Sequence, residues 1–326
     1  MAKGRELKGR IKSVENTRKI TRTMEMVATS KLKRATDRVM AARPYATAIA
    51  ETIANLYSPE LAERFPLLRQ PATIRRAAVL VLTSNRGLAG AFNANLIKEA
   101  RATIAKLERE GSEVELHVVG RKGVGFFRYV GRAVATTRTD LGDRPSATDA
   151  SSLVDGLMDG FIRGQLDAVY VISSRFQSVL STPPASERIL PVAAPEVKGA
   201  RRDYLLFPSA EELLTQLLPA YVRNAVYRAL VENEAGFQAA QRNAMKNATD
   251  NAGRSSPTSA ARTTGRARRR SRRRSRRSSA APRRSNRLAQ QLTPSDRYGY
   301  HGRSNHAGRQ DRPGHRTGAR RRVRVR

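Results

Sequence analysis

Residues 32–56 read LKRATDRVMAARPYATAIAETIANL, and the spacing of the apolar residues in this stretch decides the fold. Apolar side chains return every three or four residues, which is the pattern of a coiled-coil seam. They are Leu32, Ala35, Val39, Ala42, Ala46, Ile49, Ile53 and Leu56. A helix with one apolar stripe and polar residues elsewhere cannot bury that stripe alone, so a partner helix is expected.

The helical pattern continues toward the N-terminus and predicts one long helix over residues 3–57. Two further groups extend the stripe, with a phase slip between them: Leu7, Ile11 and Val14, then Ile20, Met24 and Val27. Pro44 lies inside this helix and is expected to kink or break it.

The period changes after this helix. Residues 77–83, 114–119 and 168–173 are short, apolar and rich in β-branched side chains, which predicts strands. Helical stretches alternate with them, at residues 91–110, 122–129 and 149–164. Strands that alternate with helices are typical of an α/β domain with a largely parallel sheet.

A second helix is predicted from residue 209 onward. Ser209 and Glu212 suggest a capping box, and an apolar stripe follows at Leu214, Leu218, Val222, Val226 and Leu230. The predicted organisation is a helix over 1–57, a linker over 58–74, an α/β domain over 75–207, a helix over 208–253 and a tail over 254–326. The two terminal helices are natural partners for each other.

Composition excludes several classes of chemistry. The chain has no Cys, so disulfides, thiolate metal sites and cysteine nucleophiles are excluded. Its four His residues form no metal-ligand spacing with Asp or Glu, and the sequence contains no nucleotide-binding or nucleophile-elbow motif. No apolar run is long enough to cross a membrane. The N-terminus begins directly with the charged helical pattern, which favours a bacterial cytosolic protein.

Two glycine-containing turns follow predicted strands. Residues 120–125 (GRKGVG) could cradle a phosphate on a helix N-terminus, although an ordinary strand-to-helix turn is the simpler interpretation. Residues 84–90 (SNRGLAG) suit a tight turn, and no base or metal supports a catalytic role there. The basic face of the first helix is either solvated or complementary to an acidic protein surface.

Three long segments resemble the gamma subunit of bacterial F-type ATP synthase. Residues 7–34 (LKGRIKSVENTRKITRTMEMVATSKLKR) look like its opening helix. Residues 83–93 (TSNRGLAGAFN) are similar to its first strand-turn segment, with Ala89 where a Cys is common. Residues 243–252 (NAMKNATDNA) resemble its second signature on the C-terminal helix. The resemblance covers residues 1 to about 252.

The resemblance implies a rotor without catalytic residues or cofactors of its own. The terminal helices would form an antiparallel coiled coil, with a small Rossmann-like α/β domain inserted between them. This shaft would turn inside a ring of three alpha and three beta subunits and couple proton flow to ATP synthesis. Residues carried over by motif position would face that ring or the partner helix: Lys12, Lys19, Ile20, Met24, Met26, Arg242, Met245, Lys246, Thr249, Asp250 and Asn251.

The resemblance also implies partners and a location. The α/β domain would lie near the membrane with the epsilon subunit and the ring of c subunits. The chain would then be peripheral to the cell membrane on its cytoplasmic face, held there through the complex. No nucleic acid is expected as a partner.

The tail departs from the family. Residues 254–326 carry 24 Arg, no Lys and two Asp, which is 22 of the formal net charge of +34. Three interpretations compete: a disordered basic arm that binds nucleic acid or acidic surfaces, a solvated tail without function, or the expected helix translated in the wrong frame.

Back-translation supports the third interpretation. With permitted codons and a shift of two bases, residues 265–282 can read RARQAQITQEIAEIVGGA, which matches the family's C-terminal segment. With a shift of one base, residues 310–325 can read IVQVIGPVLDVVFEF after an Arg, which resembles the start of the beta subunit. We therefore hypothesise a frameshift near codons 252–264.

Two rival functions remain open from the sequence. The first is a nucleic-acid-binding protein that uses the Arg-rich tail, although the basic face of the first helix lacks interleaved aromatic residues and the chain has no Trp. The second is a small α/β enzyme that uses the turn at residues 120–125. Both leave the long N-terminal apolar stripe unexplained.

Overall fold

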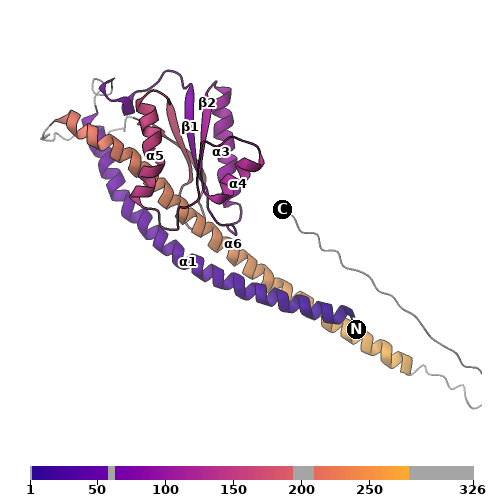
Figure 1. Cartoon of the computed structure of the whole chain (residues 1–326). Helices are drawn as coiled ribbons and strands as arrows, with labels where there is room; N and C mark the ends of the chain where they lie inside the picture. Colours follow the sequence, from indigo (N-terminus) through magenta and orange to yellow (C-terminus); the bar gives the residue numbers. More distant parts are fainter. Residues whose placement is uncertain (1, 58–62, 194–208, 279–326) are drawn as a thin grey trace, which may run out of the picture. The chain divides into compact units, whose positions relative to one another are not determined.

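The computed structural model describes the backbone of residues 2–57, 63–193 and 209–278, and the side chains of residues 6–57, 63–193 and 209–255. Two compact units divide the chain, Met1–Arg268 and Arg269–Arg326. In the first unit two long helices lie side by side, and an α/β domain packs against one flank of the pair (Figure 1).

The first helix, α1, spans Ala2–Leu56 without interruption. Pro44 therefore does not break it, although a proline inside a helix removes one backbone hydrogen bond. The predicted seam is confirmed, because Leu32, Ala35, Val39, Ile49, Ile53 and Leu56 are buried and Ala42 and Ala46 are half-buried.

The predicted phase slip in α1 is wrong. Thr21 and Ala28 are buried, whereas Ile20 and Val27 are exposed. Once Thr21 and Ala28 are included, one seam position recurs every seven residues, at Leu7, Val14, Thr21, Ala28, Ala35, Ala42, Ile49 and Leu56. An unbroken seven-residue repeat keeps the same face of a supercoiled helix on its partner throughout. Here Thr or Ala occupies four of its positions, which are Thr21, Ala28, Ala35 and Ala42.

The second long helix, α6, spans Ala210–Ser278. Its predicted stripe is confirmed, since Leu214, Leu218, Val222, Val226 and Leu230 are buried. Ser209 Oγ accepts a hydrogen bond of 3.2 Å from the Glu212 N–H, as expected of an N-cap.

The predicted end of this helix at residue 253 is wrong, because the backbone stays helical for a further stretch to Ser278. Arg and Ala, which are abundant after Gly253, are favourable in helices. The predicted disorder of residues 279–326 lies outside the described residues.

The two helices run antiparallel. Near the start of α1, the Thr21 hydroxyl lies 2.8 Å from that of Thr249, far along α6. Further along α1, Leu32, Ala35 and Val39 share a buried cluster with three residues of α6, which are Val231, Ala235 and Ala239. At its end, Ile49, Ile53 and Leu56 join the cluster that holds Leu214, Leu218 and Val222. Later residues of α1 therefore contact earlier residues of α6, as in an antiparallel pair.

The inserted domain is a five-stranded sheet in the order β3-β2-β1-β4-β5. Its strands are β1 (Arg76–Leu82), β2 (Glu113–Val119), β3 (Thr136–Arg138), β4 (Ala168–Ser174) and β5 (Pro184–Leu190). The first four are parallel and β5 pairs antiparallel with β4, which confirms the predicted largely parallel sheet. The short strand β3 and the edge strand β5 were not predicted.

Helices cover both faces of this sheet (Figure 1). They are α3 (Phe92–Arg109), α4 (Arg121–Tyr129) and α5 (Ala147–Ile162), with the short 3-10 helix η1 (Pro66–Leu68) beside α5. Alternate residues of β1 point to opposite faces: Leu80 packs in the cluster with α5, α6 and the end of α1, whereas Val79 packs in the cluster with α3 and α4. Because both faces are covered, β1 reads as a continuous apolar run.

One glycine lets α6 approach the sheet closely. A Cβ added at Gly236 would lie 2.5 Å from Ser174 Oγ and 3.3 Å from the Phe92 ring. We expect Gly236→Ala to lower the free energy of unfolding by about 1–3 kcal/mol, because the helix must move away from β4. Urea unfolding followed by circular dichroism measures this.

Gly156→Ala is the matched control. Gly156 also lies inside a helix, but nothing lies within 4 Å of its added Cβ. Its stability should be unchanged or rise by up to about 1 kcal/mol, since Ala is the better helix former. Equal effects at the two positions would contradict the close approach.

In the described ranges, no helix is both long and apolar enough to cross a membrane.

Candidate functional site

The residues expected to carry function on α1 lie mostly on its outer surface. Lys12 and Lys19 are exposed, Ile20 and Met26 are 60% and 59% exposed, and Met24 is half-buried. Val27, which is 52% exposed, lies seven residues after Ile20 and so shares its face of the helix. We call Ile20, Met26 and Val27 the exposed apolar residues of α1.

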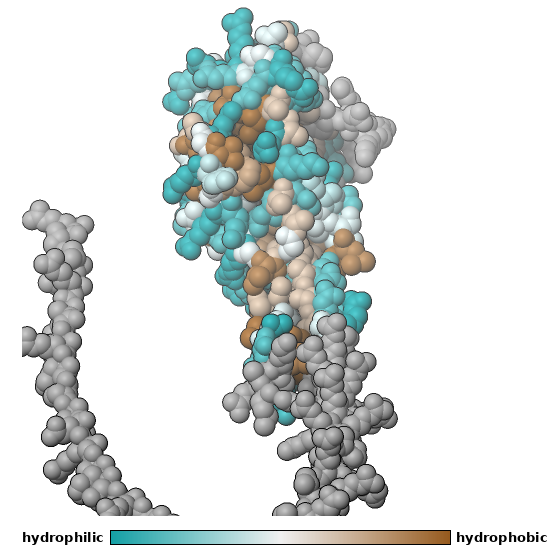
Figure 2. Space-filling model, turned by 90° about the vertical axis from the view of Figure 1, so that its right-hand side faces the viewer, coloured by the Kyte–Doolittle hydropathy of each residue, from teal (hydrophilic) through white to brown (hydrophobic). Residues whose placement is uncertain are grey.

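Exposed apolar side chains among many charges mark this part of the shaft. Lys19, Arg22 and Glu25 accompany the exposed apolar residues; Lys19 and Arg22 are exposed and Glu25 is half-buried. Figure 2 shows one face of the molecule, on which hydrophobic residues are interspersed with hydrophilic ones along the shaft. Such a mixture suits contact with another protein, with apolar side chains for burial and cations for an acidic partner.

The corresponding residues of α6 divide into two groups. Met245 and Thr249 are buried, and Thr249 Oγ1 both contacts Thr21 and donates to the Met245 carbonyl at 2.9 Å. Arg242 is half-buried, and the remaining three are exposed: Lys246, Asp250 and Asn251. Met245 and Thr249 thus belong to the seam, and the exposed three are available to a partner.

Sequence reasoning missed Thr21, although a signal was present. Counting back seven residues twice from Ala35 gives Ala28 and then Thr21. Neither is a large apolar residue, so both were passed over for the neighbouring Val27 and Ile20.

Hydrogen bonds fix the α/β domain to α6. The Ser174 N–H donates to Asn233 Oδ1 at 3.1 Å, and the Phe176 N–H donates to Glu232 Oε2 at 3.2 Å. Further along, Asn243 Nδ2 donates to the Val179 carbonyl at 2.9 Å. The end of β4 and the loop after it are therefore held along three turns of the shaft helix.

The turn at residues 120–125 uses its donors internally. The first three N–H groups of α4 donate to Asn85 Oδ1 at 3.0 Å, to the Ser84 carbonyl at 3.2 Å and to Thr83 Oγ1 at 2.9 Å. These are the groups that a phosphate would need. The turn is therefore an ordinary strand-to-helix connection, and it also ties the neighbouring turn at Ser84–Gly90 in place.

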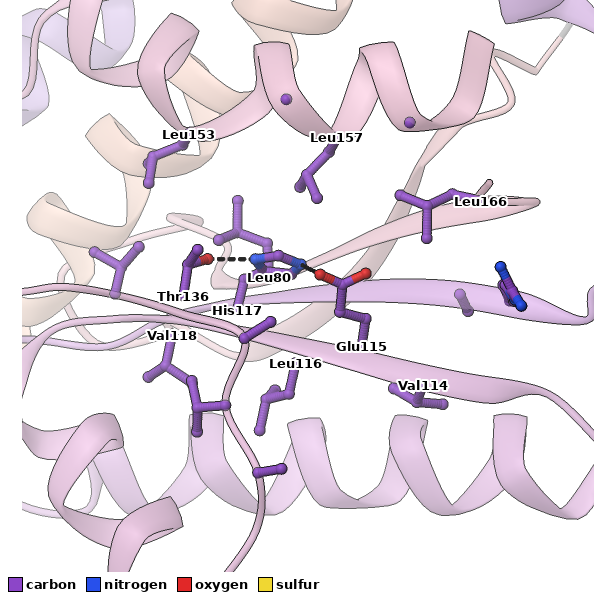
Figure 3. Close-up of a pocket in the computed structure, with 18 of the residues that line it drawn as sticks. Leu80, Val114, Glu115, Leu116, His117, Val118, Thr136, Leu153, Leu157 and Leu166 are labelled. Carbon is purple, nitrogen blue, oxygen red and sulfur yellow. Dashed lines mark hydrogen bonds and ion pairs between the residues drawn. The ribbon is translucent and has the colours of Figure 1, made fainter. Parts of the chain in front are cut away.

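A groove of about 930 Å³ runs between α5 and the β2–β3 edge of the sheet (Figure 3). Leucines of β1, α5 and the segment before β4 form much of its wall, and His117 stands in a polar row on its floor. His117 Nδ1 hydrogen-bonds to Thr136 Oγ1, and Nε2 lies 3.2 Å from Glu115 Oε1. Burial lowers the pKa of His117, although Glu115 acts in the opposite direction.

The groove does not reproduce a known nucleophile site. In Ser-His-Asp sites Nε2 faces the hydroxyl and Nδ1 faces the carboxylate. In the row of Thr136, His117 and Glu115 the two nitrogens are exchanged. We interpret the row as polar contacts of a buried imidazole, whose Nδ1 is hydrogen-bonded to Thr136 and whose Nε2 has the contact with Glu115 but no hydrogen-bond partner. Among the described residues, no group of three or more His, Cys, Asp and Glu is placed to hold a metal ion.

Comparison with known proteins now identifies the family. A family model described as ATP synthase matches residues 3–270. The ATP synthase gamma chain of Gemmatimonas aurantiaca is 69% identical over 245 residues, which are 74% of this chain and 84% of that protein. This chain belongs to the ATP synthase gamma-chain family. The gamma chain of Acidithiobacillus ferrooxidans is 40% identical over 245 residues, covering 74% of this chain and 85% of that protein.

Solved structures agree in fold. The central stalk and c-ring structure of Tetrahymena thermophila mitochondrial ATP synthase contains a chain that matches with a TM-score of 0.55 and 22% identity. That match covers 70% of this chain and 99% of the other. A chain in the rotor structure of Euglena gracilis mitochondrial ATP synthase matches with a TM-score of 0.58 and 17% identity, covering 82% of this chain and 98% of that chain. The predicted combination of a coiled coil with an α/β domain is thus confirmed, and chains of these central-stalk and rotor structures share the fold.

Family membership also decides between the functions left open by the sequence. It supports the rotor over a nucleic-acid-binding protein, so the charge of the Arg-rich tail does not define the function. The match extends to residue 270, which is further than the resemblance to about residue 252 seen from the signatures.

Proposed function

We propose that this chain is the central rotor shaft of a bacterial F-type ATP synthase. The paired helices α1 and α6 turn inside a ring of three alpha and three beta subunits. The α/β domain contacts the epsilon subunit and the ring of c subunits, so that proton flow through the membrane sector drives rotation. ATP is made and hydrolysed on the alpha and beta subunits, and this chain needs no cofactor or metal for its part.

The observation that carries this proposal is the 69% identity to a gamma chain over 245 residues. The paired helices give it a physical basis. A shaft must transmit torque along its axis, and two helices joined along an apolar seam resist twisting better than one. The exposed apolar residues of α1 and the exposed Lys12 and Lys19 would then contact the ring, as would Lys246, Asp250 and Asn251 of α6.

The ring contact can be tested by polar substitution. The double variant Ile20→Ser, Val27→Ser removes two apolar side chains that share one exposed face. We expect roughly tenfold weaker association with an alpha–beta ring, and reduced coupling of rotation to ATP hydrolysis, because buried anchors of an interface contribute about 1 kcal/mol or more. Association with the purified ring and single-molecule rotation measure the two effects.

Tyr129→Ser is the control, because Tyr129 is an exposed apolar residue of the α/β domain. It should leave ring association unchanged. If the reconstituted complex of the unaltered chain shows no rotation, the rotor proposal itself fails. If the unaltered chain rotates and the double variant behaves in the same way, the assignment of these two residues to the ring contact fails, but the rotor proposal stands.

We place the chain on the cytoplasmic face of the cell membrane, as a peripheral component held through the complex. The α/β domain would make the contacts that hold it there, by binding the epsilon subunit and the c ring. Cell fractionation tests this: the chain should sediment with membranes and be released when the complex is stripped from them at low ionic strength.

We also propose that the tail departs from the family through a frameshift near codons 252–264. Support comes from the shifted reading of residues 265–282 and from the concentration of 24 Arg after residue 253. Sequencing the gene decides the matter. The hypothesis requires codons 265–282 to contain RARQAQITQEIAEIVGGA in the frame shifted by two bases, and any other reading there refutes it.

A further inference from the structure

One loop of the α/β domain is tied to α1 by a cluster of charges. Asp143 lies in the loop between β3 and α5, and its Oδ2 is 2.6 Å from Lys31 Nζ on α1. Its Oδ1 is 3.1 Å from Arg86 Nη2 in the β1–α3 turn. In addition, Arg38 Nη1 of α1 donates to the Asp143 carbonyl at 3.2 Å. Two cations of α1 and one of the β1–α3 turn thus contact a single residue of the β3–α5 loop, Asp143.

A second carboxyl group belongs to the same cluster. Glu234 of α6 is half-buried, and with Arg86 and Asp143 it lines a cavity of about 60 Å³. Gln238 Nε2, one turn further along α6, donates to Glu234 Oε1 at 2.7 Å. Lys31 and Arg86 attract a Glu234 carboxylate, and Asp143 repels it. Two carboxyl groups therefore share one pair of cations.

The two carboxyl groups differ in how readily they ionise. Burial, with the nearby charge of Asp143, raises the pKa of Glu234 to about 7 despite the hydrogen bond from Gln238 and the charges of Lys31 and Arg86. Burial also acts to raise the pKa of Asp143, but the hydrogen bond from Lys31 and the charge of Arg86 outweigh it and the pKa is lowered. Near neutral pH, Asp143 is therefore ionised, whereas Glu234 gains or loses its proton.

We propose that Glu234 and Asp143 compete for Lys31 and Arg86, so that loss of the Glu234 proton weakens the attachment of the β3–α5 loop to α1. A Glu234 anion draws both cations toward α6 and repels Asp143. We expect the apolar seam between α1 and α6 to be unaffected, because its contacts are made by apolar side chains such as Leu32, Val39 and Val231. The cluster is a proton-sensitive joint between shaft and domain, and its existence does not depend on the rotor function.

The direction of the pH dependence follows from the raised pKa. The folded chain binds the Glu234 proton more tightly than the unfolded chain does, in which glutamate has its ordinary value of 4.5. The protonated joint therefore contributes most stability at low pH, and that contribution is lost as pH rises toward the folded pKa of about 7.

Hydrogen exchange of the full chain tests the proposal at the loop itself. After correction for intrinsic rates, we expect exchange of residues 139–146 to rise about fivefold from about pH 6 to about pH 8, on either side of the Glu234 transition. Glu234→Gln, which cannot ionise, should abolish this pH dependence. Asp143→Asn should raise exchange of the loop at both pH values and also abolish the dependence.

Asp155→Asn is the matched control. It removes an exposed ion pair with Arg223, 2.7 Å long, that lies outside the cluster. The loop of this variant should keep the pH dependence of the unaltered chain. The proposal is overturned if Glu234→Gln keeps that dependence, or if the unaltered chain shows none. Circular dichroism verifies that each variant is folded before exchange is measured.

Discussion

Replacing Gly120 with alanine should lower the free energy of unfolding by at least about 3 kcal/mol. Gly120 connects β2 to α4 with φ 95 and ψ 139, a conformation that residues with a Cβ rarely adopt. A Cβ at this position would lie 2.2 Å from the Thr83 carbonyl oxygen and 2.6 Å from its carbon. Both atoms belong to the backbone that continues β1, so no side-chain rotation relieves the contact.

The same contact holds the turn in its observed position. Thr83 Oγ1 donates to the Val119 carbonyl at 2.7 Å and accepts from the Gly123 N–H at 2.9 Å. Displacing residue 120 would break this bridge between β1 and the start of α4. The substitution should therefore disturb the packing of α4 on the sheet as well as the turn.

Two control variants separate the causes. Gly111→Ala keeps a positive φ of 85 but meets nothing within 4 Å, so it should cost only about 1 kcal/mol of backbone strain. Gly125→Ala has neither a positive φ nor a close neighbour and should be neutral or stabilising. Urea unfolding of the three variants measures the series. A Gly120→Ala effect no larger than that of Gly111→Ala would contradict the role of the backbone contact.

The elements that could be predicted from the sequence are those in which apolar residues recur at a regular spacing. The seam of α1, the stripe of α6 and three of the five strands follow from the spacing of apolar residues, and the structure confirms them. Strand β3 has three residues, too few to show a period, and it forms because β2 offers an edge to pair with. Strand β5 alternates only weakly and is stabilised by β4 beside it.

The joint between domain and shaft could not be predicted from spacing. Lys31, Arg86, Asp143 and Glu234 come from four separate elements, and only the folded chain brings them together. The motif-based site residues have a different status. Thr249 and Met245 proved to be seam residues, and the roles of the exposed ones depend on a partner that the sequence does not contain.

Replacing Val39 with aspartate should have the largest effect of any single change in the shaft. Val39 is 1% exposed and packs in the buried cluster with Val231 and Ala235 of α6. A carboxylate there would be buried against apolar side chains. We expect a loss of about 4 kcal/mol or more, enough to separate α1 from α6 over this section.

Met40→Asp provides the comparison, because the two residues are adjacent and only the seam distinguishes them. Met40 is 52% exposed, so its substitution should change the free energy of unfolding by less than about 0.5 kcal/mol. Thermal and urea unfolding followed at the helical circular dichroism signal measure both variants. If they were equally stable, the two helices could not be joined through Val39. A large difference would show that the seam, rather than helix propensity, holds the shaft together, since both changes place the same residue in the same helix.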